Sequence, residues 1–135
     1  MVHHEAQEQR EVIKHCTNMS LYIPIYGLIF HISNEGKRSL IGGRLAKLGG
    51  IKSGVPDLML PVARCGFHGL FIEMKSNVNK TSDKQDFWIT ELKEQGYKVE
   101  VCYSSFEATQ VIDKYVKGID YKPIRIQKGT NKLPF

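Results

Sequence analysis

The spacing of hydrophobic and polar residues changes several times along the chain, and each change predicts a different element. Apolar residues recur at helical spacing in residues 3–17, where Val12, Ile13 and Cys16 share one stripe. The pattern predicts further helices over residues 38–48 and 82–95, and a last helix that follows Ser104. Runs rich in apolar and β-branched residues predict strands over residues 21–32, 57–62, 70–75 and 99–103. We therefore expect an α/β protein.

Length and composition favour one domain. The chain has 135 residues, of which 41% are hydrophobic and 24% are charged, as in ordinary globular proteins. The longest apolar run, Leu21 to Phe30, is interrupted by Pro24 and Gly27 and is too short to cross a bilayer. The N-terminus is rich in glutamate and does not resemble a secretory signal. We expect a cytoplasmic protein.

Cysteine spacing and charge narrow the function classes. Cys16, Cys65 and Cys102 are far apart and lack a CxxC spacing, so we expect neither disulfides nor a thiolate zinc site. The net charge of +5 is concentrated in two segments, residues 34–52 and 118–135. Such basic segments would suit a polyanion such as nucleic acid, although a solvated basic surface is the simpler alternative.

Candidate chemistry lies in the hairpin predicted over residues 57–75. Because side chains alternate along a strand, Glu73 and Lys75 lie on one face and the apolar residues between them lie on the other. If the hairpin turns about Gly66, Asp57 lies opposite Lys75, on the face that Glu73 shares. Two carboxylates and an ammonium at one point could hold Mg²⁺ and activate water for phosphodiester hydrolysis. A solvated strand face with a Pro-Asp turn is the alternative.

These residues also carry a family resemblance. The segments HEAQEQ, GVPDLMLPV, GLFIEMK and GYKVEVC, within about residues 4–117, resemble the virus-type replication-repair nuclease (VRR-NUC) domain in its stand-alone phage form, a branch of the PD-(D/E)XK nuclease superfamily. The resemblance implies a restriction-endonuclease-like fold, with a central mixed β-sheet flanked by helices in the order αβββαβα. We accordingly predict a nuclease domain over residues 1–117 and a basic tail over residues 118–135.

The resemblance also implies roles for individual residues. Asp57 and Glu73 match the family's two metal-binding carboxylates, with the backbone carbonyl of Met74 as a further ligand, and Lys75 matches the water-activating lysine. The cofactor would be Mg²⁺ or Mn²⁺. The family places a glutamate on its first helix, for which Glu5 is the best match and Glu8 the second. Gln85 matches a glutamine after the Glu-x-Lys strand, but Ser82 and Gln85 also fit a capping box.

The expected substrate is branched DNA. Stand-alone members resemble Holliday-junction resolvases, and paired incision calls for a homodimer, with residues 21–30 or the tail as candidate interfaces. A monomeric flap or nicking nuclease, or a non-catalytic nucleic-acid-binding module, would be the alternatives. The candidate DNA-binding residues are Lys37, Arg38, Arg44, Lys47, Lys52, Ser53 and Gly54.

Overall fold

A four-stranded mixed sheet forms the centre of the protein. The computed structural model describes residues 3–33, 40–76 and 79–123. The sheet order is β1-β2-β3-β4, in which β1–β2 and β2–β3 are antiparallel and β3–β4 is parallel. The elements in chain order are α1 (His3–Met19), the 3₁₀ helix η1 (Pro24–Leu28), β1 (Phe30–His31), α2 (Leu40–Leu48), β2 (Leu58–Leu60), β3 (Leu70–Met74), α3 (Asp83–Glu94), β4 (Lys98–Cys102) and α4 (Ser105–Val116).

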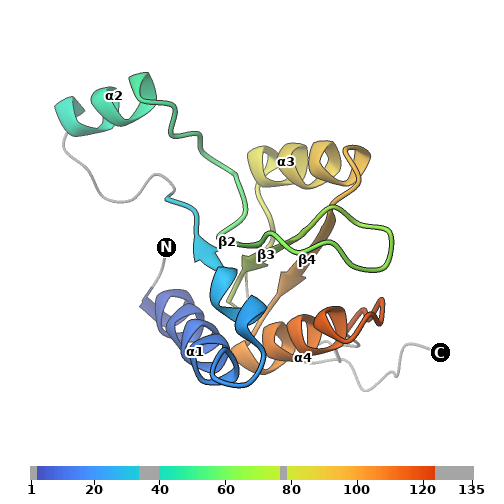
Figure 1. Ribbon diagram of the computed structural model, residues 1–135. Coiled ribbons are helices and arrows are strands. Elements are labelled where there is room, and N and C mark those ends of the chain that lie inside the picture. Colours follow the sequence, from blue (N-terminus) through green and yellow to red (C-terminus); the bar gives the residue numbers. More distant parts are fainter. Residues whose placement is uncertain (1–2, 34–39, 77–78, 124–135) are drawn as a thin grey trace, which may run out of the picture.

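Helices cover both faces of this sheet, so the predicted architecture is confirmed. Figure 1 shows α1 and α4 side by side on one face and α3 on the other. The main core lies between the α1–α4 layer and the sheet, where Leu58, Ile72 and Met74 pack against Val12 and Ile112. Burial of these side chains supplies most of the driving force for folding.

The β2–β3 hairpin forms as predicted, but its predicted register was wrong by two residues. Its turn brings Cys65 and Gly66 to positive φ between the bridged residues Arg64 and Phe67. Three residues lie between Leu60, the end of β2, and Arg64, whereas two lie between Phe67 and Leu70, the start of β3. With these unequal connections, Leu60 pairs with Leu70. Continuing this register places Asp57 opposite Glu73 rather than Lys75. Because the side-chain period is two, the error leaves all three polar residues on the expected face.

The strand predicted over residues 21–32 was also wrong for most of its length. Residues 24–28 form η1, with Pro24 at its start, and only Phe30 and His31 join the sheet. Proline has no N–H for a strand ladder, and its fixed φ suits the first turn of a helix. Packing against the core explains part of the apolar composition of this segment, because Tyr26 is buried and Ile25 and Ile29 are partly buried, whereas Leu21 and Tyr22 are exposed.

The remaining helices agree with the prediction in position but not in every packing detail. Both α3 and α4 begin after serine N-caps, Ser82 and Ser104. The helical spacing within residues 82–95 indicates Phe87 as a packing residue, but its side chain is 59% exposed, and no residue of α3 is fully buried. Cys16, Cys65 and Cys102 are free thiols, as expected.

The short helix α2 lies away from the sheet (Figure 1). Ile41, Leu45 and Leu48 recur at helical spacing along it and are all exposed. Within the described ranges, no helix is long and apolar enough to cross a membrane.

Candidate active site

Asp57 joins three strands through its main chain and its carboxylate. Its Oδ2 accepts a 2.8 Å hydrogen bond from the Met74 backbone N–H, in β3. Its backbone carbonyl accepts from the Ile32 N–H at 2.7 Å and contacts the His31 Nδ1 at 2.9 Å, next to β1. The residue is only 4% exposed. These contacts orient the carboxylate before any ligand binds.

Glu73 has a buried carboxylate, of which one oxygen has no hydrogen-bond partner among the described residues. The side chain is 3% exposed, and its Oε1 accepts a 2.8 Å hydrogen bond from Gln85 Nε2. Its Oε2 is buried and has no hydrogen-bond partner in the described part of the chain. Burial, followed by the negative charge of Asp57, raises the pKa of Glu73 to about 8, although the charge of Lys75 lowers it. A buried carboxylate in this state favours a proton or a cation.

Gln85 takes part in the capping box of α3 and also contacts a carboxylate of the candidate site, the two interpretations that the sequence left open. Its Oε1 accepts from the Ser82 N–H at 2.8 Å, and Ser82 Oγ accepts from the Gln85 N–H at 3.2 Å, which completes a capping box. Its Nε2 remains available to donate to Glu73. One side chain therefore starts α3 and orients the buried carboxylate.

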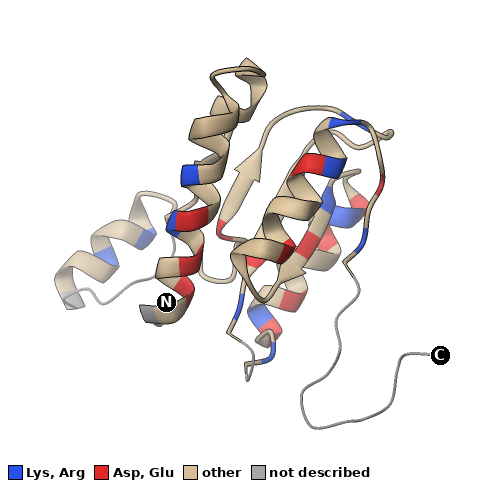
Figure 2. Cartoon of the chain, turned by 90° about the horizontal axis from the view of Figure 1, so that it is seen from below, with Lys and Arg blue, Asp and Glu red and all other residues tan. Residues whose placement is uncertain are grey.

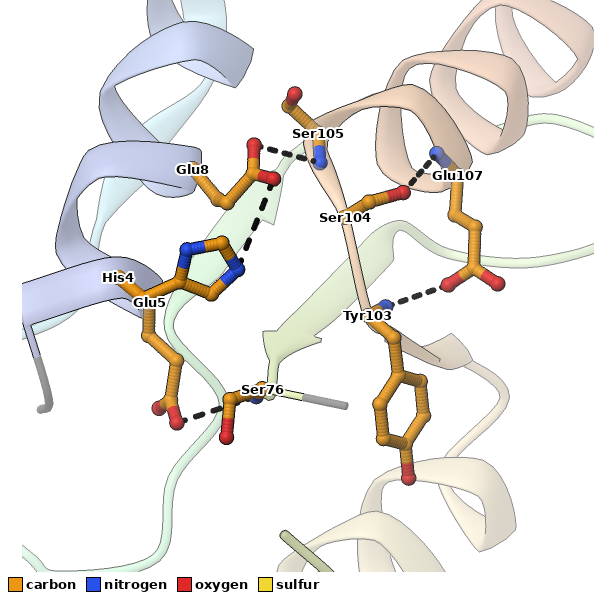
Figure 3. Close-up of polar contacts among 8 residues, drawn as sticks. All are labelled: His4, Glu5, Glu8, Ser76, Tyr103, Ser104, Ser105 and Glu107. Atoms are coloured by element: carbon orange, nitrogen blue, oxygen red, sulfur yellow. Dashed lines mark hydrogen bonds and ion pairs between the residues drawn. The ribbon is translucent and has the colours of Figure 1, made fainter. Parts of the chain in front are cut away.

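Glu5 and Glu8, the two α1 glutamates considered for the site, contact different parts of the protein (Figure 3). Glu5 is buried, and its Oε2 accepts from the Ser76 N–H at 3.2 Å, just beyond β3, and from Asn79 Nδ2 at 3.3 Å. Its charge also raises the pKa of Glu73. Glu8 instead accepts from the Ser105 N–H at 3.2 Å, at the start of α4. The geometry brings Glu5, and not Glu8, to the carboxylates.

Lys75 lies half-buried directly after β3. Its backbone N–H donates to the Cys102 carbonyl at 2.9 Å, which continues the pairing with β4. Its ammonium is near enough to lower the pKa of Glu73 against the effects of burial and Asp57. Met74 points its side chain into the core while its N–H binds Asp57.

The predicted DNA-binding residues fall into three groups. Lys37 and Arg38 lie outside the described residues. Arg44 and Lys47 on α2, and Lys52 after it, are exposed. Figure 2 shows basic and no acidic positions along α2. Ser53 is partly buried in the following turn.

Gly54, the last of the predicted DNA-binding residues, lies against the start of α3. Its φ is +92°, and a Cβ there would lie 2.7 Å from the backbone carbonyl atoms of Lys84. The close approach that it permits is therefore to the first turn of α3. Gly54 places the segment leading to Asp57 beneath the helix that carries Gln85.

The donor set suits a hard divalent cation. Asp57 and Glu73 offer oxygen ligands, and the unpartnered Glu73 Oε2 is an acceptor that a cation would satisfy. Within the described ranges, no group of three or more His, Cys, Asp or Glu side chains is arranged to hold a metal. Mg²⁺ needs only one or two protein carboxylates, with water and phosphate oxygens as its other ligands. The residues present fit such an ion.

Ser76 and Asn79 were not predicted from the sequence. They position Glu5 by donating to its carboxylate, one through the backbone and one through the side chain. Their polar, turn-forming segment directly follows the Glu-x-Lys strand, and this position is the signal that could have identified them.

The mixed sheet, with an aspartate and a Glu-x-Lys strand meeting at one end of an antiparallel hairpin, defines a PD-(D/E)XK-like nuclease fold. The model of the VRR-NUC domain matches residues 4–106, and the chain belongs to this family of nuclease domains. A solved structure described as a VRR_NUC domain protein is 27% identical, with a TM-score of 0.71, and the match covers 90% of this chain and 95% of that one. No curated protein matches the chain.

Proposed function

We propose that this protein is a divalent-metal-dependent, structure-selective DNA endonuclease, and that it resolves Holliday junctions as a homodimer. Asp57 and Glu73 would hold Mg²⁺ or Mn²⁺, with the Met74 carbonyl as the third protein ligand. The observation that carries the proposal is the buried Glu73, whose Oε2 has no partner in the described part of the chain and whose pKa is raised to about 8.

A carboxylate is costly to bury at neutral pH unless a counterion compensates for its charge. The protein retains two of them, Asp57 and Glu73, with Glu5 close enough to add to the repulsion. A purely structural hairpin would gain stability from apolar residues at the same positions. The arrangement is therefore explained better by a function that needs the charge.

The chain's own residues divide the work of hydrolysis. When bound, the cation would supply a more acidic water and neutralise charge on the scissile phosphate. Lys75 would orient the attacking water and stabilise negative charge as it develops on the phosphate oxygens. Gln85 would keep the Glu73 carboxylate in place, and Ser76 and Asn79 would hold the Glu5 carboxylate near it.

Branched DNA and a dimer are supported by the surface. The basic residues of α2 and the following turn lie on the chain segment that leads to Asp57, so they would bring phosphates towards it. The exposed apolar stripe Ile41, Leu45 and Leu48 offers a surface that a second copy could cover. Leu21 and Tyr22, within the segment predicted as an interface, are exposed as well.

The test is cleavage of a labelled four-way junction, beside a linear duplex and a 5′ flap, with Mg²⁺ or with EDTA. Wild type is compared with Asp57→Asn and with Asp83→Asn, which changes an exposed aspartate of α3 in the same way. Paired symmetric cuts that require metal and Asp57 support the proposal, and light scattering should show a dimer. Cutting of the flap alone, by a monomer, would retain the nuclease and refute the junction specificity. Binding without cutting would refute the enzyme.

A further inference from the structure

A groove of about 370 Å³ lies between α3 and the turn that follows α2. Its walls are mainly apolar and include Ile32, Ile51, Val55 and the indole of Trp88. Among the described residues that line it, Lys52 is the only charged one. The volume is at the lower end of the range of about 300 to 1,000 Å³ that is typical of small-molecule sites.

Three of these residues are tied directly to the candidate active site. The Ile32 N–H donates to the carbonyl of Asp57 at 2.7 Å, and Val55 precedes Asp57 by two residues. Trp88 follows Gln85 by three residues, so the two side chains are neighbours along the same side of α3. The groove is thus built on the same segments that position Asp57 and Gln85, and a strand whose phosphate reached Asp57 could extend a neighbouring base to it.

The chemistry of the groove indicates what it could hold. An indole provides a flat face on which a nucleobase stacks, whichever base it is, and a lysine at the rim can pair with the adjoining phosphate. The bases of an intact duplex have both faces covered by their neighbours. Unpaired bases in a flap or single strand have a free face, and a base at the centre of an open four-way junction has lost a stacking neighbour and is the easiest to turn out of its pair.

We propose that this groove binds one unpaired nucleobase of a branched or single-stranded DNA, stacked on Trp88, with Lys52 on its phosphate. The inference rests on the proposed function and deepens it, since it gives the nuclease a way to distinguish a branch from a plain duplex. Selection would come from the energy of stacking one exposed base next to the cleavage site.

Trp88 is the chain's single tryptophan, so its fluorescence reports on the groove directly. The full-length wild-type protein is titrated in EDTA with a short single-stranded oligonucleotide and with an abasic strand of equal length and charge. DNA affinity is followed separately by anisotropy of an end label. The base-bearing strand should quench Trp88 and bind more tightly, and the abasic strand should leave the emission unchanged.

Variants test the same point through affinity. Trp88→Ala should weaken binding of the base-bearing strand by about 5-fold to 100-fold. Trp88→Phe should retain most of the affinity, because a phenyl ring still offers a stacking face. Phe106→Ala is the matched control, since this exposed aromatic residue of α4 does not line the groove, and it should bind like wild type; Phe87 is unsuitable because its ring packs edge-to-face on Trp88.

Equal quenching by the abasic strand, or equal affinity of wild type and Trp88→Ala, would overturn the proposal. A change of Trp88 fluorescence with protein concentration alone, and none on adding DNA, would assign the groove to a second copy and also overturn it. None of these measurements requires cleavage. A protein that stacks the base but does not cut would refute the proposed function alone, whereas normal cutting with no stacking would refute only this inference.

Discussion

Replacement of Glu73 by glutamine should make the metal-free protein more stable at alkaline pH while it removes the proposed activity. Glu73 is almost fully buried, its pKa is raised from 4.5 to about 8, and burial is the largest cause. Between these two values the folded protein keeps the proton that the unfolded chain gives up. Stability must therefore fall as pH rises through this window, and the glutamine variant is free of that loss.

The magnitude follows from the size of the pKa change. Each unit of difference between folded and unfolded states corresponds to about 1.4 kcal/mol. Between pH 5 and pH 9, Glu73 should cost the metal-free protein on the order of 4 kcal/mol. This is a large share of the roughly 5 to 15 kcal/mol that stabilises a typical domain. The Gln85 contact can persist, because the new amide still offers an oxygen to Gln85 Nε2.

The assay is urea unfolding in EDTA at intervals from pH 5 to pH 9, for wild type, Glu73→Gln and Glu91→Gln. Glu91 is an exposed glutamate of α3 and serves as the matched control. Wild type and Glu73→Gln differ in one titrating group, so the difference between their pH profiles reports Glu73 and its interaction with Asp57. Parallel profiles for wild type and Glu73→Gln would refute the reasoning. Mg²⁺ should restore the stability of wild type at pH 9 and have little effect on Glu73→Gln.

Three further substitutions test contacts around the site. Gly54→Ala should destabilise the fold by about 2 kcal/mol or more, because alanine is strained at a φ of +92° and its Cβ would clash with the Lys84 backbone. Thermal unfolding would measure this loss, and an unchanged midpoint temperature would contradict it. Gln85→Ala should cost about 1 kcal/mol through the lost cap and also slow cleavage, so activity assayed well below the unfolding temperature should fall even where the protein is fully folded. Asp113→Asn should lower the free energy of unfolding, measured in urea, by about 1 to 3 kcal/mol without changing cleavage. The reason is that Asp113 accepts a hydrogen bond from Tyr26 and pairs with His15, far from the carboxylates. A selective loss of activity would refute this assignment.

The sequence predicted most of the elements because their patterns depend on local spacing. The helices after Ser82 and Ser104 have serine caps, and the hairpin strands contain short apolar runs. The segment 21–32 was predicted wrongly because its apolar residues have the composition of a strand, although five of its residues form the helix η1. The hairpin register depends on the unequal numbers of residues between the turn and the two strands. The positions of the glycines alone do not reveal these numbers.

The site was predicted only as far as its motifs extend. The spacing of Glu73 and Lys75 and the preceding Pro-Asp pair were visible, and a strand period of two was enough to place them on one face. The contacts of Glu5 with Ser76 and Asn79 span more than 70 residues of sequence, and such long-range pairs leave no periodic signal. The environment of Gly54 likewise depends on where α3 lies above it.

Because Gln85 both caps α3 and binds Glu73, the stability of the first turn of α3 is linked to the order of the candidate active site. The same amide group closes the capping box and holds Glu73, so fraying of that turn would release the carboxylate at the same moment. Local opening and assembly of the site are then a single equilibrium. Amide hydrogen exchange at Gln85 and Asp86 would follow this equilibrium in the absence of DNA and metal. Slower exchange on adding Mg²⁺ would reveal how much of the helix's local stability is linked to the cation.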